Sequence, residues 1–289
     1  MTPGVEAGTD MAYAFVSTVY GESIAESIAN KLEYIPTKDS SHDPFAAIHN
    51  LVPSSKPRSE PPAPPPPAGF WSRWGILAYP GFIILDAISV SIFPEIICKP
   101  EFPCSVSLIA PTLDAVPSFG QPPAGGPRLV PTHSLENPPL NLDVLVVPGL
   151  STAGPFPDHD RLVSYIRKTY STVKYIISIG TGSMLLAAAG ILDGRRATTS
   201  KSVFNTATAP FRQRETNITW TTGRWVRDGN VWTASGTAAG LDTANALCTE
   251  MFGETVTRMA AERMEYVPRM EASEDPFAEV WGVRSSESS

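Results

Sequence analysis

The stretch that decides the fold is KYIISIGTGSMLLAAAGILDGRRATTSK, Lys174 to Lys201. Residues 175–179 are β-branched or aromatic in the main and predict a buried strand, whereas the small residues of 181–189 predict a helix. Gly180 is the turn between them. In strand-turn-helix sites of this kind the turn residue normally carries the nucleophile, held at the positive end of the helix. Glycine fits a strained turn but supplies no nucleophile.

Strands and helices alternate on either side of this turn. Apolar β-rich runs predict strands at 75–80, 105–113 and 144–147, and helical patterns predict helices at 84–93, 158–170 (with Asp158 as its cap) and 241–252. The alternation predicts an α/β fold, a doubly wound and mostly parallel sheet flanked by helices. Two β-rich runs within 219–235, around Asp228-Gly229, predict a β-hairpin. Ligands of such sheets bind beyond the carboxyl ends of the strands, where Gly180 falls.

Composition excludes several classes of partner. The net charge is −7 and the Lys and Arg residues form no cluster, so we expect no nucleic-acid partner. Residues 1–20 lack a basic start, and no apolar run approaches the about 18 residues that span a bilayer. We therefore expect a cytoplasmic protein with no membrane partner.

Cysteine and histidine offer no metal centre. Cys98 and Cys104 could pair or be surface thiols, and Cys248 falls at an apolar helix position, which indicates a buried residue. We predict neither a metal nor a cofactor. The histidines are predicted to lie at the surface or outside the domain that contains the turn; they are His42, His49, His133 and His159.

The elbow stretch resembles the ThiJ/PfpI superfamily, and within it the fungal branch related to isonitrile (isocyanide) hydratases. SIGTGSMLLAAAGILDGRRATTSK matches that branch closely, with Gly180 where the cysteine belongs. Three more segments agree: ILAYPGFIILDAISV (76–90), LDVLVVPGLSTAG (142–154) and RWVRDGNVWTASGTAAGLDTANAL (224–247). The resemblance covers about 74–282. It implies a flavodoxin-like, class-I glutamine amidotransferase-like fold, a small-molecule substrate and a homodimer.

The resemblance also implies a set of site residues. Asp86 matches the carboxylate of isonitrile hydratases, although a helix cap or a solvent-facing Asp is the alternative. Thr181 matches the residue after the nucleophile, with a simple helix cap as the alternative. Gly149 and Leu150 match the loop that supplies an oxyanion donor, and Leu150 replaces a glycine, which narrows the site. Gly180 is the position of the lost nucleophile.

An internal repeat marks the N-terminal part of the chain. Residues 8–48 align without a gap with residues 240–280, so counterparts differ by 232 in number. The identical pairs include Gly21/Gly253, Glu33/Glu265, Tyr34/Tyr266, Asp10/Asp242 and Asp43-Pro44-Phe45-Ala46 over Asp275-Pro276-Phe277-Ala278. We expect residues 1–50 to be a partial repeat of the C-terminal helices, 51–70 a Pro-rich linker, 71–282 a complete domain and 283–289 a disordered tail. The repeat is either a remnant of a tandem gene or a pair of helices that docks on a partner or on its own domain.

Two functions remain open. The first is an isonitrile hydratase-like enzyme, a lyase of fungal secondary metabolism that hydrates an isonitrile to an N-formamide, or performs related acid/base chemistry, without covalent attack. The second is a catalytically dead pseudoenzyme that serves as a binding or regulatory subunit. Asp86, Thr181 and Gly149 favour the first, whereas Gly180 and the repeat favour the second.

Overall fold

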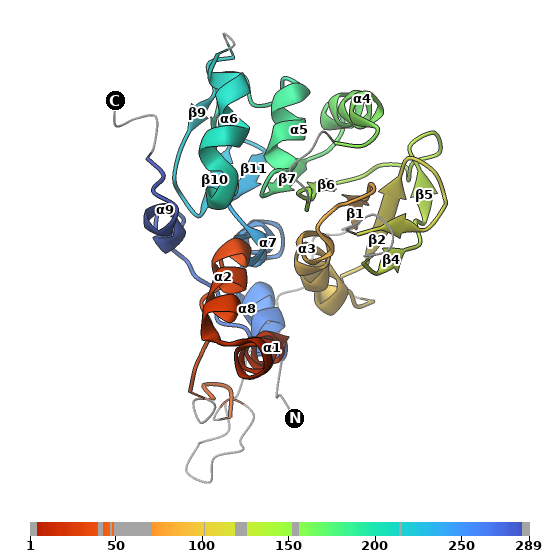
Figure 1. Cartoon of the computed structure of the whole chain (residues 1–289). Helices are drawn as coiled ribbons and strands as arrows, with labels where there is room; N and C mark the ends of the chain where they lie inside the picture. The colour runs from red at the N-terminus through yellow and green to blue at the C-terminus, as the bar shows by residue number, and fades with distance from the viewer. Residues whose placement is uncertain are drawn as a thin grey trace.

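A seven-stranded sheet forms the centre of the molecule (Figure 1). The computed structural model describes residues 5–39, 43–46, 48, 71–100, 102–118, 126–151, 156–213 and 216–284. The strand order is β10-β11-β7-β6-β1-β2-β5, and every neighbouring pair is parallel except β10 and β11. The strands are β1 (Ser72–Leu77), β2 (Cys104–Ala110), β5 (His133–Ser134), β6 (Val144–Val147), β7 (Tyr175–Ile179), β10 (Trp225–Asp228) and β11 (Val231–Ala234).

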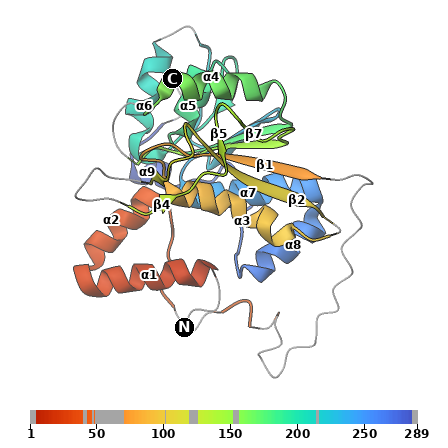
Figure 2. The ribbon, with the colours of Figure 1, turned by 90° about the vertical axis from the view of Figure 1, so that its right-hand side faces the viewer.

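Two layers of helices cover the sheet, which explains why its central strands are apolar on both faces. Figure 2 shows α4, α5 and α6 on one face of the sheet and α3, α7 and α8 on the other. All four residues of β6 are buried, as a parallel strand between two helical layers requires. The helices are α3 (Ile84–Ile97), α4 (His159–Tyr170), α5 (Gly182–Ala188), α6 (Phe204–Arg212), α7 (Thr237–Phe252), α8 (Glu254–Arg263) and α9 (Pro276–Val280).

The N-terminal helices lie outside this layered core. α1 (Val5–Tyr20) and α2 (Glu22–Leu32) contact each other at an inclined angle and lie on the side of the sheet where α3, α7 and α8 lie (Figures 1 and 2). The expected linker 51–70 and residues 285–289 of the expected tail fall outside the described residues.

The predicted fold class is confirmed, and three local predictions are corrected. β2 ends at Ala110, because residues 111–114 turn away from the sheet. β9 (Thr219–Trp220) pairs with β8 (Arg196–Ala197), so only β10 and β11 form the predicted hairpin. Asp158 precedes α4 with a φ of +53° and makes no capping bond; its carboxylate lies 3.4 Å from the guanidinium of Arg161.

Of the two alternatives for Cys98 and Cys104, pairing and surface thiols, the structure shows the pair. Cys98, just after α3, forms a disulfide with Cys104 at the start of β2, while Cys248 is buried in α7. Over the described part of the chain, the structure has no helix that is both long enough and apolar enough to cross a bilayer.

Candidate active site

The elbow at Gly180 joins the end of β7 to the start of α5. Its φ is +53°, in the left-handed region that costs an ordinary residue about 1–2 kcal/mol, so glycine removes the strain of the turn. A Cβ placed on Gly180 would lie 3.5 Å from the carbonyl oxygen of Ser235 and 3.9 Å from Oδ2 of Asp86. A side chain on residue 180 therefore has room and would extend beside Asp86.

Asp86 is the carboxylate of this site. It lies in the first turn of α3 and is only 1% exposed, so the solvent-facing alternative is wrong. Oδ2 accepts a hydrogen bond from the Gly149 amide at 2.9 Å, and Oδ1 accepts one from the Thr237 hydroxyl at 2.6 Å. Burial raises the pKa of Asp86 from its ordinary 3.8 to about 6, against the two hydrogen bonds. The side chain is therefore poised to give or take a proton near neutral pH.

Two partners of this constellation were not predicted. Thr237 begins α7 directly after the Ser-Gly that follows β11, and a hydroxyl at the carboxyl end of a central strand was the available signal. Tyr79 follows β1, is fully buried, and donates its hydroxyl to the carbonyl of Pro148. That bond fixes the Pro148-Gly149 turn whose amide holds Asp86, so Tyr79 is a positioning residue.

The expected oxyanion donors are already engaged. The Leu150 amide donates to Oγ1 of Thr181 at 2.8 Å, just as the Gly149 amide donates to Asp86. Thr181 occupies the N-cap position of α5, as the helix-cap alternative expects, but its side chain makes no capping bond. In this structure the loop amides orient the two site side chains.

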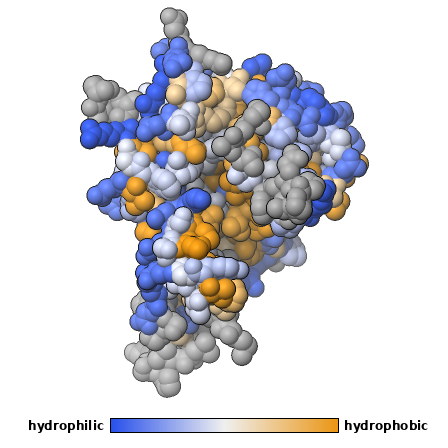
Figure 3. Space-filling model, viewed as in Figure 1, coloured by the Kyte–Doolittle hydropathy of each residue, from blue (hydrophilic) through white to orange (hydrophobic). Residues whose placement is uncertain are grey.

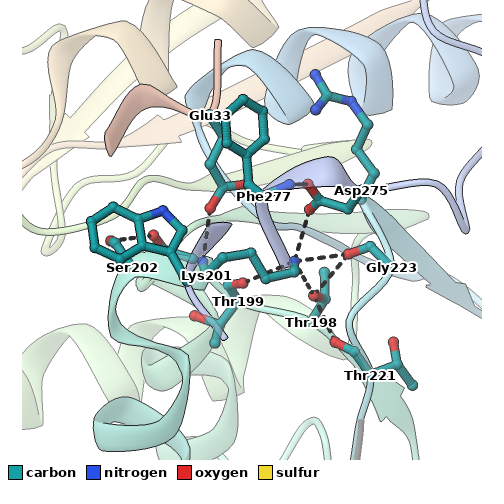
Figure 4. A network of polar contacts seen from close by, with 12 residues as sticks. Glu33, Thr198, Thr199, Lys201, Ser202, Thr221, Gly223, Asp275 and Phe277 are labelled. Carbon is teal, nitrogen blue, oxygen red and sulfur yellow. Dashed lines mark hydrogen bonds and ion pairs between the residues drawn. The ribbon is translucent and has the colours of Figure 1, made fainter. Parts of the chain in front are cut away.

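A buried polar network lies beside the elbow, centred on Lys201 (Figure 4). Its ammonium pairs with the Asp275 carboxylate at 3.0 Å and donates to Oγ1 of Thr198 and to the carbonyl of Gly223, at 3.1 and 3.0 Å. Burial lowers the pKa of Lys201 from its ordinary value, whereas the charges of Glu33 and Asp275 oppose that shift.

Glu33 brings the N-terminal segment into this network. It caps the end of α2 in the left-handed conformation, is 0% exposed, and accepts the Lys201 backbone N–H at 2.7 Å (Figure 4). Burial raises its pKa, and its charge also raises the pKa of Asp86. A Cβ on Gly236 would lie 2.7 Å from Cδ of Glu33, so only glycine permits this approach. No sequence pattern pointed to this contact.

The structure thus brings together Asp86, Gly149, Leu150, Gly180 and Thr181. His133 lies on the edge strand β5 and His159 at the exposed start of α4, so neither belongs to the site; His42 and His49 fall outside the described residues. Among the described side chains, no group of three His, Cys, Asp or Glu residues is arranged to hold a metal ion. The arrangement can support proton transfer by the buried carboxyl of Asp86.

Comparison with known proteins identifies the family of this chain. Residues 105–250 match the DJ-1/PfpI family, a range that includes the elbow and the Gly149 loop but begins after Asp86. The chain is 34% identical over 147 residues to the isonitrile hydratase of Pseudomonas putida. That alignment covers 50% of this chain and 60% of the relative, so the chain spans less than two thirds of the relative's length.

Solved structures show the same fold. A ThiJ/PfpI family protein from Pseudomonas syringae superposes with a TM-score of 0.59 and 26% identity, over 76% of this chain and 85% of that one. DJ-1beta of Drosophila melanogaster superposes with a TM-score of 0.54 and 18% identity, over 68% and 100% of the two chains.

Proposed function

The chain belongs to the DJ-1/PfpI family, and on that premise we propose that it is an isonitrile hydratase-like enzyme that uses Asp86 for acid and base chemistry in place of a covalent nucleophile. One observation carries the proposal. Asp86 is buried, is held by Gly149 and Thr237, and has a pKa of about 6 directly beside the elbow. The likeness to the Pseudomonas putida isonitrile hydratase supports the substrate class.

Asp86 would act in two steps. Its protonated carboxyl gives a proton to the terminal carbon of the isonitrile R–N≡C, which forms the C–H bond and leaves a nitrilium cation, R–N≡CH⁺. Water then adds to that carbon and loses a proton to the Asp86 carboxylate, which regenerates the acid. The product R–N=CH–OH tautomerises to the formamide R–NH–CHO, so one water is consumed and nothing else.

Gly180 limits which steps are open. A thioimidate on residue 180 cannot form, because glycine carries no thiol, and in a measured protease removal of the nucleophile cost about 10⁶ in turnover. We propose that the space beside Gly180, bounded by Ser235 and Asp86, receives the isonitrile carbon. The burial of Asp86 also keeps bulk water from competing for its proton.

The test compares wild type with Asp86→Asn on a water-soluble aliphatic isonitrile, with the formyl proton of the product followed by NMR. Only the protonated carboxyl of Asp86 can donate. With a pKa of about 6, about a tenth of the Asp86 carboxyl groups are protonated at pH 7. The wild-type rate should therefore fall about tenfold per pH unit above pH 6. Equal rates for the two proteins, or a rate independent of pH, exclude the mechanism.

The engaged loop amides favour a second candidate, a binding protein without turnover. Gly149 and Leu150 hold Asp86 and Thr181, so neither is directed at a substrate oxyanion. In that case isonitriles or formamides raise the melting temperature while turnover stays at the uncatalysed rate. Wild-type turnover well above that rate excludes this candidate.

A further inference from the structure

The N-terminal segment, described at residues 5–39 and 43–45, has the same local structure as its counterpart in residues 237–277, the C-terminal segment. Glu33 and Glu265 both adopt the left-handed conformation after a helix, with φ of 53° and 51°. Three hydrogen bonds recur 232 residues apart. Asp10 Oδ1 accepts from the Tyr34 hydroxyl and the Thr37 amide, just as Asp242 Oδ1 accepts from the Tyr266 hydroxyl and the Arg269 amide. Asp43 Oδ1 accepts from the Phe45 amide, just as Asp275 Oδ1 accepts from the Phe277 amide. Each segment is therefore the same structural unit.

The two segments differ in what covers them. Phe15 of α1 is 64% exposed, whereas its counterpart Leu247 in α7 is fully buried. The same holds for Ile24 and Ile28, which are exposed on α2 while their counterparts in α8 are buried. Figure 3 shows this apolar surface on the N-terminal helices. The N-terminal segment thus exposes the face that a complete domain covers with its own core.

The segments also contact each other in a reciprocal way. Glu33 of the N-terminal segment packs against Gly236, the residue directly before the C-terminal segment. Its counterpart Glu265 shares the wall of a cavity of about 660 Å³ with Glu6 and Ala7, at the start of the N-terminal segment. Glu6 in turn accepts the Val267 amide at 3.1 Å. Reciprocal contacts of this kind define a two-fold interface between copies.

We propose that the N-terminal segment stands in for the C-terminal segment of a second copy, so that this chain completes its own site with Glu33 where a homodimer would use Glu265 of the second copy. Two observations indicate that the N-terminal segment contributes to the site when it takes this place. Glu33 binds the Lys201 amide beside the elbow, and its charge acts on Asp86. The face that a second copy would need is therefore occupied within the chain. This proposal does not depend on the reaction proposed above, because it concerns assembly.

The test displaces the segment in the full chain and measures mass by light scattering after size exclusion. Ala25 and Ala29 are the buried positions of α2 among the described residues, so Ala25→Arg with Ala29→Arg should release the segment. We expect wild type at its monomer mass of 31.0 kDa and the double variant at about twice that mass. Adding Glu265→Ala should return the double variant to a monomer.

A matched control uses two exposed positions of the same helix, each one residue before a buried alanine. Ile24→Arg with Ile28→Arg introduces the same charges at exposed positions and should keep the wild-type mass. A folded Ala25/Ala29 variant that keeps the wild-type mass overturns the proposal, as does a dimer that persists with Glu265→Ala.

A second measurement serves if the double variant fails to fold. In otherwise wild-type chains, Glu33→Ala should accelerate hydrogen–deuterium exchange of the peptide that contains Lys201, because the amide loses its acceptor, whereas Glu265→Ala should leave that exchange unchanged. Equal exchange in wild type and Glu33→Ala overturns the proposal.

Discussion

Replacement of Asp86 by asparagine should remove a pH dependence of stability that this single carboxyl creates. Burial raises its pKa in the folded state to about 6 from an ordinary 3.8, so between these values the folded state holds a proton that the unfolded state releases. The contribution of Asp86 is therefore most favourable below pH 3.8, is lost as the pH rises toward 6, and is constant above that.

The size of the effect follows from the pKa difference. A shift of about 2.2 pH units corresponds to about 3 kcal/mol over the whole range. Between pH 4.5 and pH 7.5, the loss is about 2 kcal/mol. Asparagine has the same shape and no titration. Its Oδ1 can accept the Gly149 amide and its Nδ2 can donate to the Thr237 hydroxyl, so the packing is kept.

The assay is urea unfolding followed by tryptophan fluorescence at intervals between pH 4.5 and 7.5. The free energy of unfolding of Asp86→Asn minus that of wild type should rise by about 2 kcal/mol across this range. All other titrating groups are common to the two proteins and cancel in the difference. A difference that changes by less than about 0.5 kcal/mol would refute the claim that Asp86 is desolvated in the folded state.

Three other substitutions test the surroundings of the site. Gly180→Cys places a side chain at a φ of +53° and should destabilise the protein by about 1–2 kcal/mol in urea unfolding, and activity that appears only in this variant would show that Asp86 does not suffice. Lys201→Met leaves the Asp275 carboxylate buried without its partner and should cost about 3–5 kcal/mol, most of it recovered by adding Asp275→Asn; a cost below about 1 kcal/mol contradicts the buried pair. Thr181→Val removes the acceptor of the Leu150 amide and should cost about 1–3 kcal/mol, whereas Thr181→Ser should be close to wild type in thermal unfolding; equal losses in both would assign the effect to packing instead.

The fold could be predicted because its decisive signals are local. β6 and β7 are short apolar runs, and the turn at Gly180 separates a strand pattern from a helix pattern within ten residues. The boundaries were less predictable at the ends of strands. Thr219–Trp220 has strand composition, but its partner β8 is set by tertiary pairing, which no local pattern encodes.

The candidate site was only half predictable, because its missing members come from distant parts of the chain. Asp86 lies in a recognisable segment, yet its burial and its bond to Thr237, 151 residues away, depend on how α3 and α7 pack together. Glu33 was visible as an identical position of the repeat. That it reaches Lys201 depends on where the repeat docks, and the sequence left that open.

The bond between Glu33 and Lys201 joins residues of one chain, 168 positions apart. If a homodimer completed its site with the same carboxylate from a second subunit, dilution below the dissociation constant would dismantle that site. A tethered carboxylate is present at an effective concentration on the order of millimolar whatever the concentration of the protein. Assembly of the site becomes a first-order step, and the chain keeps a complete site even as a single molecule.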